Sequence, residues 1–494
     1  MFTDELRRNV WDRIRQQGLR AFAGQLSPTI LREAARHAGV KLGRGPLHVA
    51  NLVWLGLAAA LHTAKNFADV LTLALKLLQD TPGWESSPLG VACRGSRRRG
   101  RPRDRRRGGR RSPHDPRCRD PGQLSEEAFV QARRRMPMIF WEALFVLLHE
   151  RFAAEHANLL AWRGFRLLAL DGTEINLPNR QRLRDYFGTA ANGKGARTVQ
   201  ARMVMLQFPR VRLPWKYTLA PRGQGERTLA AELLTGLRPH DLVLMDRGFW
   251  SYGLFCQIQQ QRAFFALRLM KGLHFQTRRR YGPDDRLVRW TPTDRQWRAA
   301  GLPASITLRV MNYQIPGFRR CALVTSLLDR SIRKEQWVGL AVHSEAGRTL
   351  APGLYHRRWE IETTFMELKV RQGMEGHLRS HTPEGIRYEV AGHVLLYLLV
   401  RWLMVEAAAK TGQDPLRLSF LNTLRELTDM SPSLLTAALP RVARVLLPRL
   451  LARVAEHLVP LRPGRHYPRP GDTKVRNKGK GKRCLPSKLI RNVA

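Results

Sequence analysis

Four residues that can do chemistry recur at helical spacing in one short stretch of the chain. The segment reads Tyr355-His-Arg-Arg358-Trp-Glu-Ile-Glu362-Thr-Thr-Phe-Met-Glu-Leu-Lys369. As an α-helix at about 100° per residue, it places Tyr355, Arg358, Glu362 and Lys369 within an arc of about 60°. A carboxylate that shares a stripe with two cations and a phenol suits a ligand carrying both phosphates and metal ions. The pattern therefore predicts an enzyme that cuts or joins a nucleic-acid backbone.

Two aspartates elsewhere can complete such a site. Asp171 and Asp246 follow short apolar runs at 165–170 and 241–245, which read as β-strands. Hard divalent ions such as Mg²⁺ prefer carboxylate oxygens and leave positions open for substrate phosphate. Two such ions about 4 Å apart activate the attacking oxygen and stabilise the leaving one. Arg358 and Lys369 are placed to offset the negative charge of the transition state.

Each signal alone also has an ordinary structural explanation. Asp171-Gly172 is a common tight-turn pair, and Asp246 could likewise lie in a turn. Arg358 and Glu362 could form a salt bridge on a solvated helix face. Their occurrence in one basic chain, in a sensible order of strands and helices, favours the catalytic interpretation.

In these residues the sequence resembles the DDE transposases of the insertion-element-four class. Their signature is Tyr-x2-Arg-x3-Glu-x6-Lys, which residues 355–369 match at every spacing. The contexts of the two aspartates, Leu-Asp171-Gly-Thr and Asp246-Arg247-Gly-Phe, are similar to those of the family, as is the run at 379–385. The resemblance is weak over 5–80 and good over 122–483.

The resemblance implies a fold, a metal and a partner. It implies an α/β fold with an RNase-H-like mixed-sheet core and a β-rich insertion between Asp246 and Glu362, to which the residue pattern adds a helical N-terminal domain and a basic disordered tail. It implies two Mg²⁺ ions, with Mn²⁺ as a substitute, held by Asp171, Asp246 and Glu362. Tyr355, Arg358, Lys369 and Arg247 are then expected to contact double-stranded DNA, both the element's ends and the target. Synapsis of two ends implies a homodimer.

The pattern of apolar and turn-forming residues predicts the domain organisation. We expect a helical domain over 1–81, an Arg/Gly/Pro-rich disordered linker over 82–121, a core formed by 122–271 and 346–460, a β-rich insertion over 272–345, and a basic tail over 461–494. Ser27 and Pro28 predict a helix start. Whether the N-terminal helices recognise DNA ends or mediate multimer contacts, or only pack against the core, stays open.

The charge of the chain predicts a polyanionic partner. The 494 residues carry a net charge of +45. Residues 94–119 contribute +11 and residues 461–494 contribute +10, which leaves +24 on the remainder. Such an excess is typical of nucleic-acid binding. The Arg-rich stretch departs from the family pattern, and we consider either a phosphate-binding linker or a segment read out of frame.

Other classes of protein are disfavoured. Five widely spaced cysteines without a C-x-x-C pair argue against disulfides or structural zinc and fit a reducing cytosol. The resemblance to insertion-element transposases implies in addition a bacterial protein that is cytoplasmic and nucleoid-associated. No signal peptide or ATP-binding loop is found, and the apolar run at 394–405 contains Arg401 and reads as a buried helix rather than a membrane span. Trp337 and Trp359 could stack on a displaced base. The rival functions are an inactive, decayed or domesticated DNA-binding copy and an RNase-H-like nuclease acting on RNA hybrids.

Overall fold

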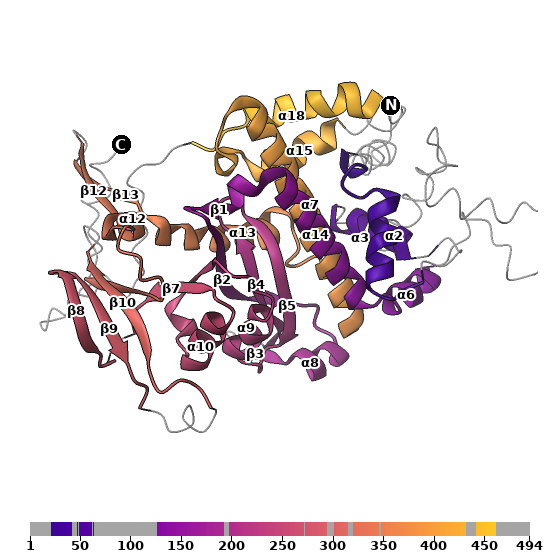
Figure 1. Cartoon of the computed structure of the whole chain (residues 1–494). Helices are drawn as coiled ribbons and strands as arrows, with labels where there is room; N and C mark the ends of the chain where they lie inside the picture. The colour runs from indigo at the N-terminus through magenta and orange to yellow at the C-terminus, as the bar shows by residue number, and fades with distance from the viewer. Residues whose placement is uncertain are drawn as a thin grey trace, which may run out of the picture.

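The computed structural model describes residues 21–41, 47, 49–61, 63, 126–191, 197–270, 272–293, 301–314, 320–344, 347–430 and 441–460. The predicted linker over 82–121 and the predicted tail over 461–494 lie outside these residues. Helices and strands alternate along most of the described chain, and one large mixed sheet forms its centre (Figure 1). This confirms the expected mixed α/β class. The predicted domain boundaries stay a prediction.

The N-terminal helices pack against the rest of the described chain. Helix α2 (Pro28–His37) begins at Ser27, whose side chain accepts a hydrogen bond from the Ile30 amide, as predicted. Helix α3 (Val49–Leu61) lies against the long helix α14 (Pro383–Thr411). The two helix backbones approach closely at Gly392 and Gly56. A Cβ added to Gly392 would lie 2.8 Å from the Gly56 carbonyl oxygen, so glycine is needed at this contact. Packing is therefore one role of these helices.

The sheet combines antiparallel and parallel pairing. Its strand order is β3-β4-β2-β6-β7-β11-β10-β9-β8 among the described residues, with β5 paired to β4 and β1 to β2. Strands β2 (Phe165–Asn176), β4 (Arg197–Phe208) and β5 (Leu213–Pro221) form an antiparallel meander, whereas β6 (Asp241–Met245) and β7 (Phe264–Arg268) continue it in parallel with β2. Strands β2, β6 and β7 therefore run in the same direction, and β2 continues past the position at which β6 ends.

The remaining strands extend this sheet or stand beside it. The region predicted to be β-rich, 272–345, contains β10 and β11, and β11 pairs with β7, so this region continues the central sheet. The bounds are β1 (Ala161–Trp162), β3 (Thr189–Ala191), β8 (Gln276–Gly282), β9 (Asp285–Trp290), β10 (Ile306–Tyr313), β11 (Cys321–Thr325), and a separate hairpin of β12 (Gly339–Ser344) and β13 (Gly347–Pro352).

Helices surround the sheet and bury its apolar side chains. Besides α2, α3 and α14 they are α6 (Glu126–Arg134), α7 (Met138–Leu160), α8 (Gln181–Phe187), α9 (Glu226–Leu234), α10 (Tyr252–Gln260), α12 (Lys334–Val338), α13 (Glu360–Met366), α15 (Phe420–Asp429) and α18 (Leu447–Glu456), with short turns η4 (Arg247–Phe249), η5 (Leu354–Trp359), η6 (Glu367–Arg371), η7 (Pro415–Arg417) and η8 (Val442–Leu446). Helix α14 is the one described helix long and apolar enough to cross a membrane, but 94% of its apolar window is buried inside the protein. The prediction of a buried core helix is confirmed.

Two local predictions were wrong. The strand that begins at Phe165 does not end before Asp171 but continues through it to Asn176, because residues 171–176 pair with β4. The segment that contains Tyr355 and Lys369 is not one α-helix. It is a 3₁₀ turn in η5, an α-helix in α13 and a π-helical turn in η6.

Candidate active site

Strand register brings the two aspartates together. Leu170 of β2 lies opposite Met245 of β6 in the parallel pair, so Asp171 and Asp246 occupy the next positions on neighbouring strands. Neighbouring strands lie about 4.8 Å apart. The apolar residues before each aspartate are fully buried and fix this register. The two carboxylates therefore lie side by side where β6 ends, partway along β2.

Arg358 joins the third carboxylate to the first. Its guanidinium donates to Asp171 Oδ2 at 3.1 Å and to Glu362 Oε1 at 3.0 Å. The Arg358 side chain is 2% exposed, whereas that of Glu362 is 37% exposed. Although burial opposes the charge of Arg358, Tyr355 and the surrounding carboxylates raise its pKa. The structure thus brings Asp171 and Glu362 to one cation, with Asp246 beside them.

The site perturbs the titration of Asp171. Burial raises the pKa of Asp171 to about 6, while Arg358 and the Gly172 amide oppose the rise and Asp246 and Glu362 add to it. The three carboxylates are therefore close enough to interact electrostatically. A buried acid beside two others is a site where a divalent cation would be stabilised.

The donor set fits a divalent ion chemically, but the side chains are not arranged around one. Among the residues that the structure describes, no group of three His, Cys, Asp or Glu side chains is positioned to hold a metal ion. Arg358 lies between two of the three expected ligands. For Asp171 and Glu362 to bind one ion together, the Arg358 guanidinium has to move away from at least one of them.

The remaining predicted residues surround this cluster at different depths. Tyr355 is buried and donates a hydrogen bond from its hydroxyl to the Met245 carbonyl at 2.9 Å, and burial raises its pKa to about 12. Lys369 Nζ donates to the Glu174 carbonyl at 2.7 Å and lies 3.5 Å from the Glu375 carboxylate. Arg247 is exposed in η4, directly after Asp246. Tyr355 therefore supports the strand beneath Asp246, and Lys369 lies along β2.

Two further charged residues belong to the cluster and were missed in the sequence. Arg268 lies 3.6 Å from the Asp246 carboxylate. Leu267 of β7 pairs with Met245 of β6, so Arg268 continues the row formed by Asp171 and Asp246. Its position at the end of the next apolar strand was a usable signal. Glu375 contacts Lys369 and accepts the Asn176 amide at 2.9 Å, and nothing in the sequence indicated that contact.

Of the two tryptophans considered for base stacking, one is excluded. Trp337 is 0% exposed and packs in the interior against Trp162, so it cannot stack on a base. Trp359 is 42% exposed and lies beneath the Arg358 guanidinium, 5.2 Å from the ring centre. Only Trp359 remains available for such a contact.

Known proteins match the chain over the part that forms this site. A family model described as a transposase DDE domain matches residues 162–399, which contain all three carboxylates. Residues 162–399 are a transposase DDE domain. A relative, the transposase InsG for insertion sequence element IS4 of Escherichia coli (strain K12), is 27% identical over 355 residues, 70% of this chain and 76% of that protein. The resemblance to DDE transposases of the insertion-element-four class is confirmed, and with it the expectation of a transposase enzyme.

Two further matches cover different shares of the chain. The putative transposase InsZ of the same organism is 28% identical over 140 residues, 28% of this chain and 47% of that protein. Among solved structures, a piggyBac transposase synaptic complex with hairpin DNA has a TM-score of 0.38 and 10% identity, covering 93% of this chain and 88% of that one. DDE transposases use divalent metal ions, which agrees with the carboxylate cluster.

Proposed function

We propose that this transposase binds the terminal inverted repeats of an insertion element and catalyses Mg²⁺-dependent DNA cleavage and strand transfer by in-line phosphoryl transfer. The observation that carries the proposal is that Asp171 and Asp246 lie on neighbouring strands where β6 ends, and that Arg358 joins Asp171 to Glu362. An antiparallel β5-β4-β2 meander followed by parallel β6 and β7 supports an RNase-H-like core.

Asp171, Asp246 and Glu362 would hold two Mg²⁺ ions, and Mn²⁺ could replace Mg²⁺. When bound, the metal supplies an activated oxygen nucleophile and stabilises the leaving oxygen. Asp171 and Asp246, fixed on neighbouring strands, set the position of the scissile phosphate. Glu362 approaches from α13, and Lys369 and Arg247 offer positive charge to phosphates on either side. Arg358, once released from a carboxylate, is placed to contact the phosphate, and Tyr355 keeps the Asp246 strand in place.

The partners follow from the proposed reaction. They are double-stranded DNA of the element ends and of the target, and a second copy of this chain when two ends are paired. Phosphoryl transfer between DNA strands conserves bond energy, so no ATP is required. The protein would act in the bacterial cytoplasm, on the DNA of the nucleoid.

Substitution of the three carboxylates tests this function. Asp171→Asn, Asp246→Asn and Glu362→Gln should each abolish cleavage and strand transfer while leaving binding to the element's ends intact, because phosphate contacts do not need the metal ligands. Asp185→Asn, an exposed aspartate on α8, is the control and should cleave normally. The assay is in-vitro cleavage of the element's own ends with Mg²⁺ or Mn²⁺, alongside a gel-shift measurement.

The alternative is a catalytically inactive or decayed copy that only binds DNA, which the Arg-rich stretch at 94–119 favours. In that case the wild-type chain binds the ends but cleaves nothing with either ion. The coding sequence is then expected to show a frame change near codons 82–121, whereas short inverted repeats in the flanking DNA are expected for an active element. Normal cleavage by any one of the three carboxylate variants would instead refute the metal assignment.

A further inference from the structure

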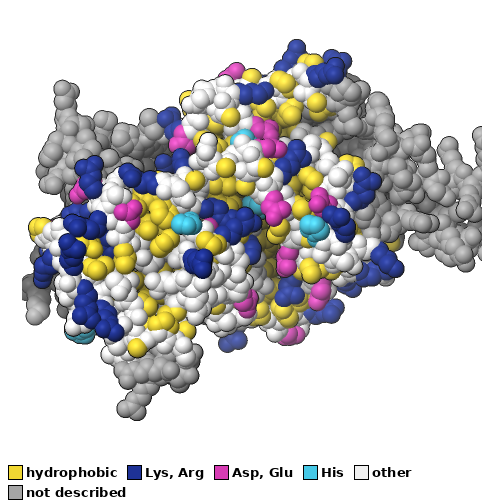
Figure 2. All heavy atoms as spheres, in the orientation of Figure 1, with side chains coloured by type: hydrophobic (Ala, Val, Ile, Leu, Met, Phe, Trp, Pro, Cys, Tyr) yellow, Lys and Arg dark blue, Asp and Glu magenta, His cyan; other side chains and the backbone are white. Residues whose placement is uncertain are grey.

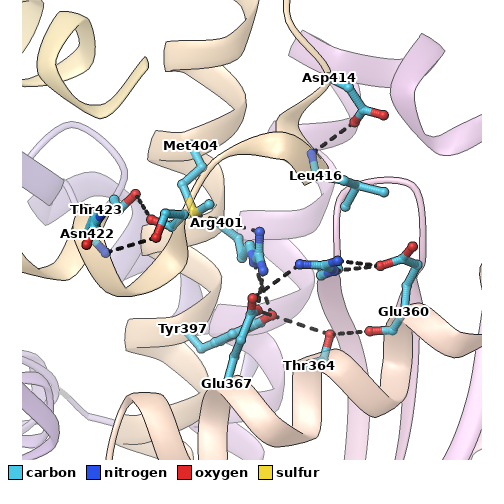
Figure 3. A network of polar contacts seen from close by, with 12 residues as sticks. Glu360, Thr364, Glu367, Tyr397, Arg401, Met404, Asp414, Leu416, Asn422 and Thr423 are labelled. Carbon is cyan, nitrogen blue, oxygen red and sulfur yellow. Dashed lines mark hydrogen bonds and ion pairs between the residues drawn. The ribbon is translucent and has the colours of Figure 1, made fainter. Parts of the chain in front are cut away.

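A buried ionic network lies beneath the helix that carries Glu362. Glu367, at the start of η6, is bound by Arg401 of α14, accepts the Tyr397 hydroxyl at 2.6 Å and accepts a hydrogen bond from Arg212 at 3.2 Å (Figure 3). The side chains of Glu367 and Arg401 are 7% and 1% exposed. Burial alone raises the pKa of Glu367, but Arg401 and Arg212 lower it below its usual value, so the carboxylate is ionised.

Arg212 spans two turns of the same helix. Besides Glu367, it contacts the Glu360 carboxylate at 2.7 Å. Arg212 lies in the β4–β5 connection with a φ of 52°, a left-handed conformation that costs a non-glycine residue about 1 kcal/mol or more. Strained residues of this kind persist where surrounding contacts hold them. The two carboxylates provide such contacts.

The network and the active site occupy opposite faces of one helix. Within α13, at about 100° per residue, Glu362 lies about 200° around the helix axis from Glu360. The contacts agree, because Glu360 and Glu367 face Arg212 whereas Glu362 and Lys369 face Arg358 and strand β2. Holding one face therefore fixes the rotation of the other.

The π-helical turn makes this rotation critical. The Gln372 amide bonds to the Glu367 carbonyl at 2.8 Å, which is the wide i to i+5 spacing of a π-turn. Such a turn inserts a residue into the helix and changes the direction of the side chains that follow, and π-turns occur frequently at functional sites. Lys369 lies inside this turn, so its direction depends on where the turn begins. Glu367, its first residue, is the one that the network holds.

We propose that Arg212, Glu367 and Arg401 are positioning residues that set the rotation of the active-site helix, so that Glu362 and Lys369 face the strand of Asp171. The proposal rests on the function proposed above. Stability alone explains the network poorly, since buried ion pairs often contribute no more than apolar residues of the same volume. A function in orienting catalytic groups gives these charges a reason to be buried.

The experiment separates positioning from folding. Arg212→Gln removes both ion pairs from the helix, and we expect the single-turnover cleavage rate to fall about 100-fold, the effect of a small misplacement of catalytic groups. Affinity for the element's ends should stay within about 2-fold, because no phosphate contact is removed. The control is Arg309→Met, which breaks a buried ion pair of similar geometry between Arg309 of β10 and Asp285 of β9 (3.0 and 2.6 Å). It should lower the thermal midpoint without changing the cleavage rate per folded molecule.

Conservative variants complete the test. Arg212→Lys keeps one charge but cannot bridge both carboxylates, so it should restore part of the cleavage rate. If Arg212→Gln does not fold, Glu360→Gln weakens only one of the two ion pairs of Arg212 and should lower the rate in the same direction. Wild-type cleavage by folded Arg212→Gln, or an equal loss of rate in Arg309→Met, would overturn the proposal. If Glu362→Gln also cleaves normally, the proposed function fails first; if only Arg212→Gln does, the positioning role alone is wrong.

Discussion

Arg358 decides the state of the carboxylate cluster at the scale of single residues. Its side chain is nearly fully buried and forms an ion pair with each of Asp171 and Glu362. A cation held in this way stabilises the cluster without metal, and it competes with a divalent ion for the same oxygens. Arg358 is therefore an internal counter-ion as well as an expected phosphate contact.

Removing this counter-ion should change how the protein responds to metal. Arg358→Met removes the ion-pair partner of two carboxylates. Without metal, we expect the free energy of unfolding to fall by about 1–3 kcal/mol and the thermal midpoint to fall with it. Added Mn²⁺ should then raise the midpoint by more than it does in the wild type, because ligand stabilisation grows with affinity. Thermal unfolding with increasing Mn²⁺ measures both effects. An equal Mn²⁺ response in the two proteins would show that Arg358 does not compete with the ion. DNA cleavage should fall in the same variant.

At the scale of elements, α14 supports the active-site helix from below. Gln372, the residue that follows η6, donates to His393 Nδ1 at 3.1 Å and to the His393 carbonyl at 2.8 Å. His393 is buried, and burial, with help from Arg379 and His377, lowers its pKa to about 3. Because Nδ1 accepts a hydrogen bond, the neutral ring is the form that fits. The end of the active-site helix thus depends on an uncharged histidine.

This contact predicts loss of stability in acid. The unfolded chain binds the His393 proton near pH 6.5, but the folded chain does so only near pH 3. The contribution is therefore complete above pH 6.5 and is lost as the pH falls toward 3, by about 2 kcal/mol at pH 5. Chemical denaturation between pH 7 and 5 should show this slope, and His393→Gln should reduce it. His37→Gln, at an exposed site, is the control. An unchanged slope in His393→Gln would assign the acid sensitivity to other groups.

At the scale of the whole molecule, positive charge is spread over the surface as well as concentrated in two stretches of sequence. Lys and Arg side chains gather over the β8–β9 end of the molecule (Figure 2), where Arg278, Arg279 and Arg280 are exposed on strand β8. Strand β8 is the last strand in the sheet order, with a pairing partner on one side only among the described residues. This end of the sheet offers phosphates a surface away from the carboxylate cluster.

DNA binding should therefore be strongly dependent on salt. Between 50 and 200 mM salt we expect affinity to fall about 1,000-fold or more, as for proteins that contact six or more phosphates. Deleting residues 461–494 removes a net charge of +10 and should make the dependence less steep. Fluorescence anisotropy with element-end and unrelated duplexes measures both slopes. Affinity that hardly changes with salt would indicate binding through base contacts instead.

The sequence by itself predicted the candidate residues of the site and part of the framework that positions them. Asp171, Asp246 and Glu362 were predicted from residue type, spacing and resemblance, and strand β6 formed at the bounds predicted for it. Such features are local: apolar runs, turn residues and helical spacing act within a few residues. The sequence indicated only that each aspartate follows an apolar strand. The pairing of β2 with β6 is what places Asp171 beside Asp246.

Only the tertiary structure decided what the charges contact. Helical spacing could not reveal that the signature segment changes from 3₁₀ to α to π, because the contacts of Glu367 with Arg401 and Arg212 come from distant parts of the chain. Nor could it show that Tyr355 is buried or that Arg268 completes the row beside Asp246. Electrostatic partners and burial depend on which segments meet in space, and a linear pattern does not specify those meetings.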